Sequence, residues 1–276
     1  MENFQTKRNE DIADLFTGHV GGCVSHAILA GEMGRVIADE TDRSFAVLEM
    51  PELNFALVAG NARHPLARTY IESLTKFAKL IFDSDDFVAL AEEVHPGKWI
   101  VLDRFAFSSE QLDTERVRQM KTVLPNGFRI EKVDLSLAKQ FRKKKNSFAS
   151  IHGEMFKSPE DFVERGVGFC ALEGNSIAAV ASSFAVCDQG IEIQIDTRKK
   201  YRGRGLATAV AAHLIVHCLE NNLDPSWDAA TEISAKFAQK LGYTPQGTYK
   251  MHVFTNSKFL VHLRHHLQKV KRFLNK

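Results

Sequence analysis

The chain has 276 residues, of which 44% are hydrophobic and 25% charged, which is ordinary for globular protein and enough for one large or two modest domains. Its formal net charge of +2 argues against a general nucleic-acid binder. The four cysteines are scattered without a CxxC pair, so we expect no disulfide framework, no metal site and reduced thiols in the cytoplasm. No apolar run reaches the roughly 18 residues that a membrane span needs, so we expect no membrane span.

The first half of the chain predicts a mixed α/β module without a catalytic motif. Alternating apolar and polar residues predict strands, and apolar spacings of three and four predict helices. In order, we expect a short helix over 11–16, a glycine turn over 18–22, strands over 44–49 and 55–59, a helix over 66–82, a strand over 99–107 and a charged helix over 110–122. We interpret residues 1–124 as a supporting domain, followed by a turn over 124–127.

The second half opens with a predicted strand over 128–133 and a helix over 136–145. The basic run over 142–145 is typical of a solvated face or of a patch for an acidic partner, and we expect the solvated face. Ser158 and Pro159 predict the next helix start, because serine caps a helix and proline suits its first position. Strands over 168–172 and 177–186 then predict a hairpin.

Residues 190–222 carry the clearest pattern in the chain. Isoleucines alternate with Glu192, Gln194 and Asp196, which predicts a strand with one buried face. From Leu206 the apolar residues recur every four positions, which predicts an amphipathic helix ending at Asn221-Asn222. The order of the elements is therefore strand, loop, helix.

The loop between this strand and helix has the composition of an anion site. Its sequence is Lys199-Lys200-Tyr201-Arg202-Gly203-Arg204-Gly205, where two glycines let backbone N–H groups approach a ligand. The first N–H groups of the helix have no partner within the helix and lie at the positive end of its dipole, which favours a phosphate there. A plain glycine turn with solvated basic residues is the alternative, and we expect a diphosphate site.

Two common phosphate motifs are absent, since no third glycine and no Lys-Thr pair follow Gly205. The pattern [RQ]xxGx[GA] does match, as Arg202-Gly203-Arg204-Gly205-Leu206-Ala207. It resembles the acetyl-CoA pyrophosphate loop of the GNAT superfamily of N-acetyltransferases. The resemblance extends through residues 225–230 and 234–243, which are similar to the superfamily's fifth strand and the helix ending in Leu-Gly-aromatic, and it covers residues 127 to about 254.

The resemblance implies a mixed central sheet flanked by helices. It places a GNAT-like domain over 125–276, after a smaller α/β domain over 1–124. It also implies acetyl-CoA as the donor and CoA as the product. The residues implied for cofactor binding are Ile195, Thr197, Arg202, Gly203, Arg204, Gly205, Leu206, Ala207, Thr208 and Ser234.

Glu192 is the candidate catalytic residue. An amine that attacks a thioester must first lose a proton, and a carboxylate on the strand beside the thioester can accept it. The resemblance implies such a carboxylate at position 192. The alternative is an exposed strand glutamate without a catalytic role.

Two positions depart from the pattern of the superfamily. The tyrosine that protonates the leaving thiolate in many members is Ala238 here, and an asparagine common before the same helix is Thr231. Tyr243 is expected in the core instead. A CoA thiol is a fairly good leaving group, so acyl transfer does not require a dedicated acid, but the mechanism is left incomplete.

Three histidines are candidates for metal ligands or substrate contacts. His213 and His217 are four residues apart on the long helix, but the glutamate of HExxH is missing, so we expect two polar-face histidines rather than a metal site. His152 lies where a substrate-facing loop would run and is a candidate for substrate contact.

The C-terminal segment over 257–276 predicts a basic amphipathic helix. Such a helix can lie on an anionic membrane or bind a partner groove, but packing on its own protein or on a second subunit is commoner. We expect packing, which leaves a homodimer open.

We therefore expect a cytoplasmic acyltransferase that moves an acetyl group from acetyl-CoA to a primary amine, either a small molecule or a peptide N-terminus. One alternative is a catalytically silent module that binds or senses acyl-CoA, which the alanine at position 238 favours. Another is an interaction protein working through its basic C-terminal helix. The identity of the acceptor is open, because pocket residues come from variable loops.

Overall fold

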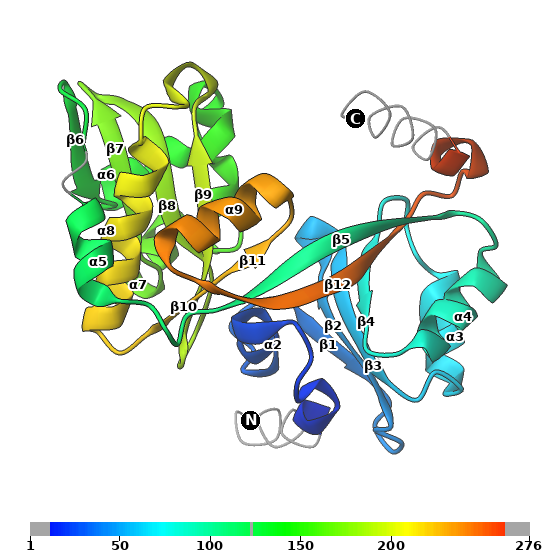
Figure 1. The fold of residues 1–276 in the computed structure, drawn as a ribbon. Helices are drawn as coiled ribbons and strands as arrows, with labels where there is room; N and C mark the ends of the chain where they lie inside the picture. The colour runs from blue at the N-terminus through cyan, green and yellow to red at the C-terminus, as the bar shows by residue number, and fades with distance from the viewer. Residues whose placement is uncertain (1–11, 122–123, 263–276) are drawn as a thin grey trace. The chain divides into compact units, whose positions relative to one another are not determined.

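The computed structural model describes residues 12–121 and 124–262, and Figure 1 labels their elements. The chain divides into two compact units. The described part of the first comprises residues 12–21, 28–104 and 248–262, and that of the second comprises 22–27 and 105–247 without residues 122–123. Two long strands, β5 (Trp99–Ser108) and β12 (Thr244–Phe254), have residues in both units. The predicted domain boundary between residues 124 and 125 stays a prediction.

The first unit is built on a sheet whose strands follow the order β1-β2-β3-β4-β12-β5. The pairs β1–β2, β2–β3 and β4–β12 are antiparallel, whereas β3 and β4 are parallel. Most residues of β2 and β3 are buried, which is why, apart from Glu49, their sequences are apolar. The elements of this unit besides β5 and β12 are η1 (Asp14–Phe16), β1 (Arg35–Ala38), β2 (Phe45–Met50), η2 (Pro51–Leu53), β3 (Phe55–Gly60), α3 (Pro65–Glu72), β4 (Lys79–Phe82) and α4 (Asp85–Val94).

The predicted helix over 66–82 is wrong in its second half. Helix α3 ends at Glu72, and residues 79–82 form β4 instead. Phe77, which the helical spacing included, adopts the left-handed backbone conformation with φ 69°, which a continuous right-handed helix cannot contain. Leu80 and Ile81 are buried because the short strand lies between two neighbours in the sheet. The prediction also missed β1, α4 and β12.

The second unit is built on a five-stranded sheet in the order β10-β9-β8-β7-β6. Only the β9–β10 pair is parallel. This mixed sheet flanked by helices confirms the predicted fold class. The elements are α5 (Thr114–Met120), β6 (Phe128–Lys132), α6 (Leu135–Phe141), η3 (Lys144–Gly153), α7 (Pro159–Arg165), β7 (Gly168–Glu173), β8 (Ser176–Cys187), β9 (Gly190–Thr197), η4 (Lys199–Tyr201), α8 (Leu206–Glu220), β10 (Asp224–Ser226), β11 (Asp228–Ala229) and α9 (Glu232–Leu241), with α2 (Gly22–Leu29) beginning in this unit.

Each face of this sheet has its own hydrophobic cluster. Ala171 of β7 packs in a cluster with α5, α8 and α9, whereas its neighbours Cys170 and Leu172 pack in a cluster with α6, η3 and α7. Neighbouring residues of a strand point to opposite faces, so the two groups of helices cover opposite faces. Ile191 and Ile193 belong to the first cluster. Glu192 between them, and Gln194 and Asp196 in the same alternation, therefore point toward the face that α6, η3 and α7 cover.

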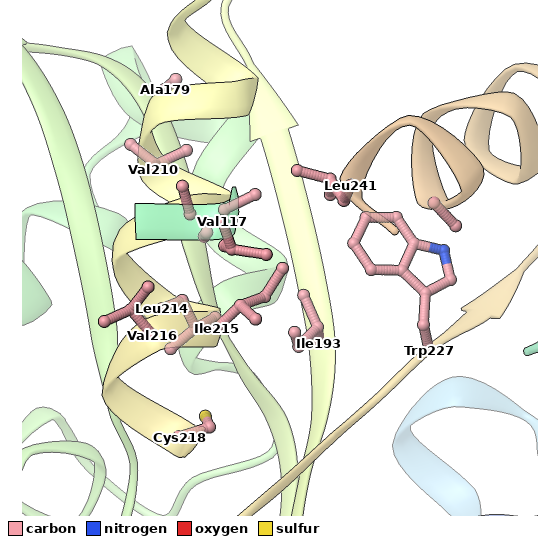
Figure 2. Close-up of a cluster of buried hydrophobic side chains, with 14 of the residues drawn as sticks. Val117, Ala179, Ile193, Val210, Leu214, Ile215, Val216, Cys218, Trp227 and Leu241 are labelled. Carbon is pink, nitrogen blue, oxygen red and sulfur yellow. The ribbon is translucent and has the colours of Figure 1, made fainter. Parts of the chain in front are cut away.

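Helix α8 is the centre of the first cluster (Figure 2). Ten of its residues are buried, among them Val210, Leu214 and Ile215, so it packs on more than one side. Figure 2 shows Val117 of α5, Ile193 of β9, and Trp227 and Leu241 around it. This packing fixes the helix start next to the end of β9.

Several predicted boundaries are corrected. The helix expected over 110–122 begins only at Thr114, because the Asp113 side chain caps it by accepting from the N–H groups of Glu115 and Arg116. The helix expected over 136–145 ends at Phe141, and η3 follows. The glycine turn over 18–22 leads directly into α2, which was not predicted. The predicted C-terminal helix lies outside the described residues from 263 onward.

Candidate active site

Strands β9 and β10 pair over a short distance and then separate. Their parallel register contains only Asp224 with Gly190, Pro225 with Ile191, and Ser226 with Glu192. After Trp227 the chain continues as β11, which pairs with β5 instead. In the part of the chain that the structure describes, β9 from Ile193 to Thr197 therefore has a strand partner on one side only. An unpaired strand edge offers backbone N–H and C=O groups to a ligand.

The predicted anion loop follows directly at the end of β9. Gly203 and Gly205 both have left-handed backbone conformations, with φ of 76° and 81°, which side chains other than glycine rarely adopt. A Cβ atom at Gly203 would have no atom within 4 Å, so the backbone there is open to an approaching ligand. Gly205 is the N-cap of α8, and no side chain caps the helix. The first N–H groups of α8 are thus left for an external acceptor.

The loop itself carries four cationic side chains, those of Lys199, Lys200, Arg202 and Arg204. All four are exposed, and none forms an ion pair with any carboxylate of the described residues. Arg202 donates from Nε to the carbonyl of Thr197 at 3.2 Å, which holds its guanidinium at the end of β9. Unpaired cations next to free helix N–H groups form a site for a dianion or a diphosphate.

Tyr201 holds the loop onto the sheet. It is buried, its hydroxyl donates to Glu173 Oε2, and its ring meets Phe128 edge-on at 5.5 Å. Lys200 Nζ lies 4.4 Å and the Arg204 guanidinium carbon 5.6 Å from the centre of the same ring. The ring therefore positions two of the four cations.

Thr197 gives a second indication of a ligand site. Its Oγ1 is buried, and it makes no hydrogen bond to any described residue. Buried hydroxyls are nearly always paired, so an unpaired one beside the anion loop fits a ligand with polar groups. The two left-handed glycines, the uncapped helix and this hydroxyl together are suited to the phosphates and the arm of CoA.

Glu192 lies at the point where β9 and β10 separate. Its Oε1 accepts a hydrogen bond from the backbone N–H of Asp228 at 2.9 Å. The side chain is half-buried and points to the face opposite Ile191 and Ile193. This contact fixes one carboxylate oxygen at the strand edge, beside the open part of β9.

Helix α2 borders the strand pair near Glu192, which the sequence did not reveal. The Cys23 thiol donates to the carbonyl of Gly190 at 3.5 Å, and a Cβ atom at Gly22 would lie 3.4 Å from Ser226 Oγ. The first turn of α2 therefore packs against β9 and β10 beside Glu192. No motif marks it, because a helix that begins within a GHVGG run looks like a turn.

The other predicted residues are placed as follows. Leu206, Ala207 and Thr208 form the first turn of α8, and Lys240 Nζ lies 3.5 Å from Thr208 Oγ1. Ile195 packs against the core cluster, and Ser234 lies in the first turn of α9, which Thr231 caps. The binding roles of these residues stay predictions.

Tyr243 and Ala238 are both buried. Tyr243 donates to the carbonyl of Pro225 at 2.7 Å, and burial raises its pKa well above the usual range. It is therefore a structural residue rather than a proton donor.

The histidines of α8 pack against an aromatic ring. The ring centres of His213 and His217 lie 5.7 and 6.0 Å from that of Phe169, and His213 Nδ1 is within hydrogen-bond distance of the Ala209 carbonyl, at 2.8 Å.

Across residues 12–121 and 124–262, we find no group of three or more His, Cys, Asp or Glu side chains that could hold a metal ion. Within the same ranges, no helix has both the length and the hydropathy to cross a bilayer.

A strand that loses one of its two neighbours and then runs into a glycine-rich loop at a helix start is an arrangement suited to a diphosphate-bearing ligand. The chain belongs to the GNAT acetyltransferase family, whose match spans residues 13–252. The match confirms the resemblance and begins well before residue 127, where we expected it to start. The general activity of this family, and hence of this chain, is acetyl transfer.

Similar proteins agree with this assignment. The chain is 27% identical over 229 residues to the uncharacterized N-acetyltransferase YdfB of Bacillus subtilis, covering 79% of this chain and 85% of that one. A GCN5-related N-acetyltransferase-like protein from Streptococcus suis has a TM-score of 0.79 and 28% identity, covering 90% and 98% of the two chains. A GNAT-family protein from Novosphingobium aromaticivorans shares the fold at a TM-score of 0.53 and 14% identity, covering 85% and 96%.

Proposed function

We propose that the chain transfers an acetyl group from acetyl-CoA to a primary amine, with Glu192 as the general base. The observation that supports it most is the loop of Gly203 and Gly205, which leads into the uncapped helix α8 beside the open edge of β9. Acetyl-CoA supplies a thioester carbonyl and a thiolate leaving group. All protein parts of the proposed site belong to the second unit.

The loop would hold the diphosphate of the donor. The N–H groups at the start of α8 and the guanidinium groups of Arg202 and Arg204 are its proposed donors. Thr197 and Ile195 then border the arm of the donor along β9. This orientation brings the reacting end of the donor toward Glu192, at the opposite end of the open strand edge.

Glu192 would accept the proton that the amine loses. The Asp228 N–H holds Oε1 of this carboxylate at the strand edge, where the carboxylate would accept the proton directly or through a bridging water. A positioned general base contributes a rate factor of about 10² to 10⁴. Holding amine and thioester together supplies most of the remainder.

A silent acyl-CoA-binding module is the second candidate. It is favoured by Ala238, which is buried and stands where many members of the superfamily carry the acidic tyrosine. Tyr243 cannot replace that tyrosine, because its hydroxyl is engaged by Pro225 in the core. Acyl transfer without a dedicated acid requires the thiolate to leave unassisted, which its low basicity permits.

The test compares Glu192→Gln with wild type by release of free thiol from acetyl-CoA with a panel of primary amines. Glutamine keeps the oxygen that accepts from Asp228, so the fold should persist. We expect turnover to fall by about 10² to 10⁴ with unchanged acetyl-CoA affinity. Glu164→Gln, on the exposed face of α7, is the matched control and should behave as wild type. If wild type binds acetyl-CoA but turns over no amine, the silent binding module is the better account. If Glu192→Gln turns over as fast as wild type, Glu192 is not the general base.

A further inference from the structure

A buried polar cluster lies on the face of β9 that carries Glu192, and the proposed chemistry does not use it. It consists of Gln194 and Asp196 from β9, Ser182 from β8 and His152 from η3. Ser182 and Gln194 are register partners in the sheet. Ser182 is 0% and His152 1% exposed, so these two are sealed beneath the strand face.

The hydrogen bonds of Ser182 fix the imidazole of His152. Ser182 Oγ lies 2.7 Å from His152 Nδ1 and 3.4 Å from the carbonyl of Ser183. The shorter contact is the stronger hydrogen bond, so the Ser182 hydroxyl donates to His152 Nδ1. Burial lowers the pKa of His152, which keeps the ring neutral. With Nδ1 accepting from Ser182, the ring proton lies on Nε2.

Nε2 of His152 faces the carboxylate of Asp196. The distance to Oδ2 is 3.4 Å, and Nε2 has no well-aligned hydrogen bond to any described residue. Gln194 Nε2 donates to the same oxygen at 2.8 Å. The Gln194 amide orients the carboxylate, and because Gln194 and His152 are both neutral, neither cancels its charge.

Asp196 also remains open on one side. Its side chain retains 34% of its exposure, and no Lys or Arg of the described residues pairs with it. The three residues Ser182, His152 and Asp196 do not form a hydrolytic triad, because the Ser182 hydroxyl is fully buried and no substrate can reach it. The arrangement is instead that of a fixed, accessible negative charge.

The spacing to Glu192 suggests what this charge would bind. Glu192 and Asp196 are four residues apart on one strand face, which places them about 13 Å apart at the usual rise of 3.3 Å per residue. Resting on the proposed function, Glu192 marks where the reacting amine lies. We propose that Asp196 binds a second ammonium group of the acceptor and that His152 is the residue that positions it. Allowing about 3 Å for contact at each end, the preferred acceptor is a linear diamine with its nitrogens roughly 7–10 Å apart.

The experiment compares diaminohexane with hexylamine as acceptors, which differ by the second amine. The variants are Asp196→Asn and the control Asp188→Asn, an equal loss of charge at the exposed turn between β8 and β9. We expect Asp196→Asn to raise KM for diaminohexane about tenfold, with kcat and the hexylamine reaction changed less than about twofold. Asp188→Asn should leave all values as in wild type.

The positioning role has its own variant. His152→Ala should raise KM for diaminohexane in the same direction as Asp196→Asn without lowering kcat for hexylamine. If this buried substitution prevents folding, Asp196→Asn still tests the subsite, because Asp196 is half-exposed and its replacement should not disturb the fold. A purely structural role would lower the yield or stability of both variants and leave the diaminohexane-to-hexylamine ratio unchanged.

Calorimetry of diaminohexane binding to the protein with bound CoA separates this proposal from the proposed function. Saturable binding that Asp196→Asn weakens supports the subsite, even if no amine is turned over, in which case only the acetyl-transfer proposal fails. The subsite is overturned if wild type does not bind diaminohexane, or if Asp196→Asn changes neither its affinity nor its KM.

Discussion

At the scale of single residues, the burial of His152 leads us to expect that stability depends on pH. Its ring is buried, and burial outweighs the attraction of Asp196, so its pKa is lowered from the usual 6.5. Burial likewise lowers the pKa of His19, His213, His217 and His252. Each of these groups takes up its proton more readily in the unfolded chain than in the folded one.

We therefore predict that the free energy of unfolding falls as pH drops below 6.5. Between the lowered folded pKa and 6.5 the unfolded chain binds more protons, so acid favours unfolding, by up to about 1.4 kcal/mol per pH unit for each fully linked histidine. Above 6.5 this contribution is constant. Urea unfolding between about pH 5 and pH 8 measures it.

The histidine responsible can be separated from the others. His152→Gln removes a titrating group and keeps a polar side chain of similar reach, so the slope of stability against pH should become shallower than in wild type. A slope that is the same in both proteins would show that His152 does not take part.

The residues of the anion loop could be predicted from the sequence, but their support could not. The glycines and cations form one contiguous run, so their pattern is visible locally. The contact of Tyr201 with Glu173 joins residues 28 positions apart, and that of Ser182 with His152 joins residues 30 apart. Local patterns carry no information about such pairings.

At the scale of elements, helix α7 is the clearest case in which sequence fixes a helix start. Ser158 Oγ accepts from the Asp161 N–H at 3.1 Å, and Pro159 occupies the first helical position, which confirms the prediction. We expect Ser158→Ala to lower the free energy of unfolding by about 1 kcal/mol, because one N–H group loses its acceptor. Chemical denaturation measures this, and Ser158→Asn, which keeps an acceptor, should lose much less. Equal losses in both variants would contradict the cap.

A glycine of the loop before α8 has a matched glycine in the turn before β6. Gly203 and Gly127 have similar left-handed backbones, with φ of 76° and 86°, and neither has an atom within 4 Å of an added Cβ. Both alanine variants should therefore lose about 1–2 kcal/mol of stability through backbone strain. Only Gly203→Ala should also weaken acetyl-CoA binding, as measured by calorimetry. A similar loss of affinity in Gly127→Ala would mean that the effect is not local to the loop.

Elements with a clean period were predicted well, and elements without one were not. The alternation over 190–197 and the period of four after Leu206 correspond to β9 and α8. The apolar spacing over 66–82 fits a helix almost as well as a short helix followed by a buried strand, and only the left-handed Phe77 and the sheet partners of β4 separate the two. The strand expected over 225–230 is broken at Trp227, because its two parts pair with different partners.

At the scale of the whole molecule, long-range pairing decides the architecture. Strand β12 pairs with β4, although His252 and Leu80 are far apart in the sequence, and neither β5 nor β12 belongs wholly to one unit. The family match over residues 13–252 spans both units in the same way. A division by composition along the chain cannot reveal such an interleaved order.

The most direct test of the account is a calorimetric titration of the whole chain with CoA and, separately, with pantetheine, which lacks the diphosphate. If the loop between β9 and α8 holds the diphosphate, CoA should give saturable heat, and pantetheine should bind at least about a hundredfold more weakly. Replacing Arg202 and Arg204 together by alanine should bring the affinity for CoA toward that for pantetheine. No saturable heat with CoA, or equal affinity for CoA and pantetheine, would contradict the account.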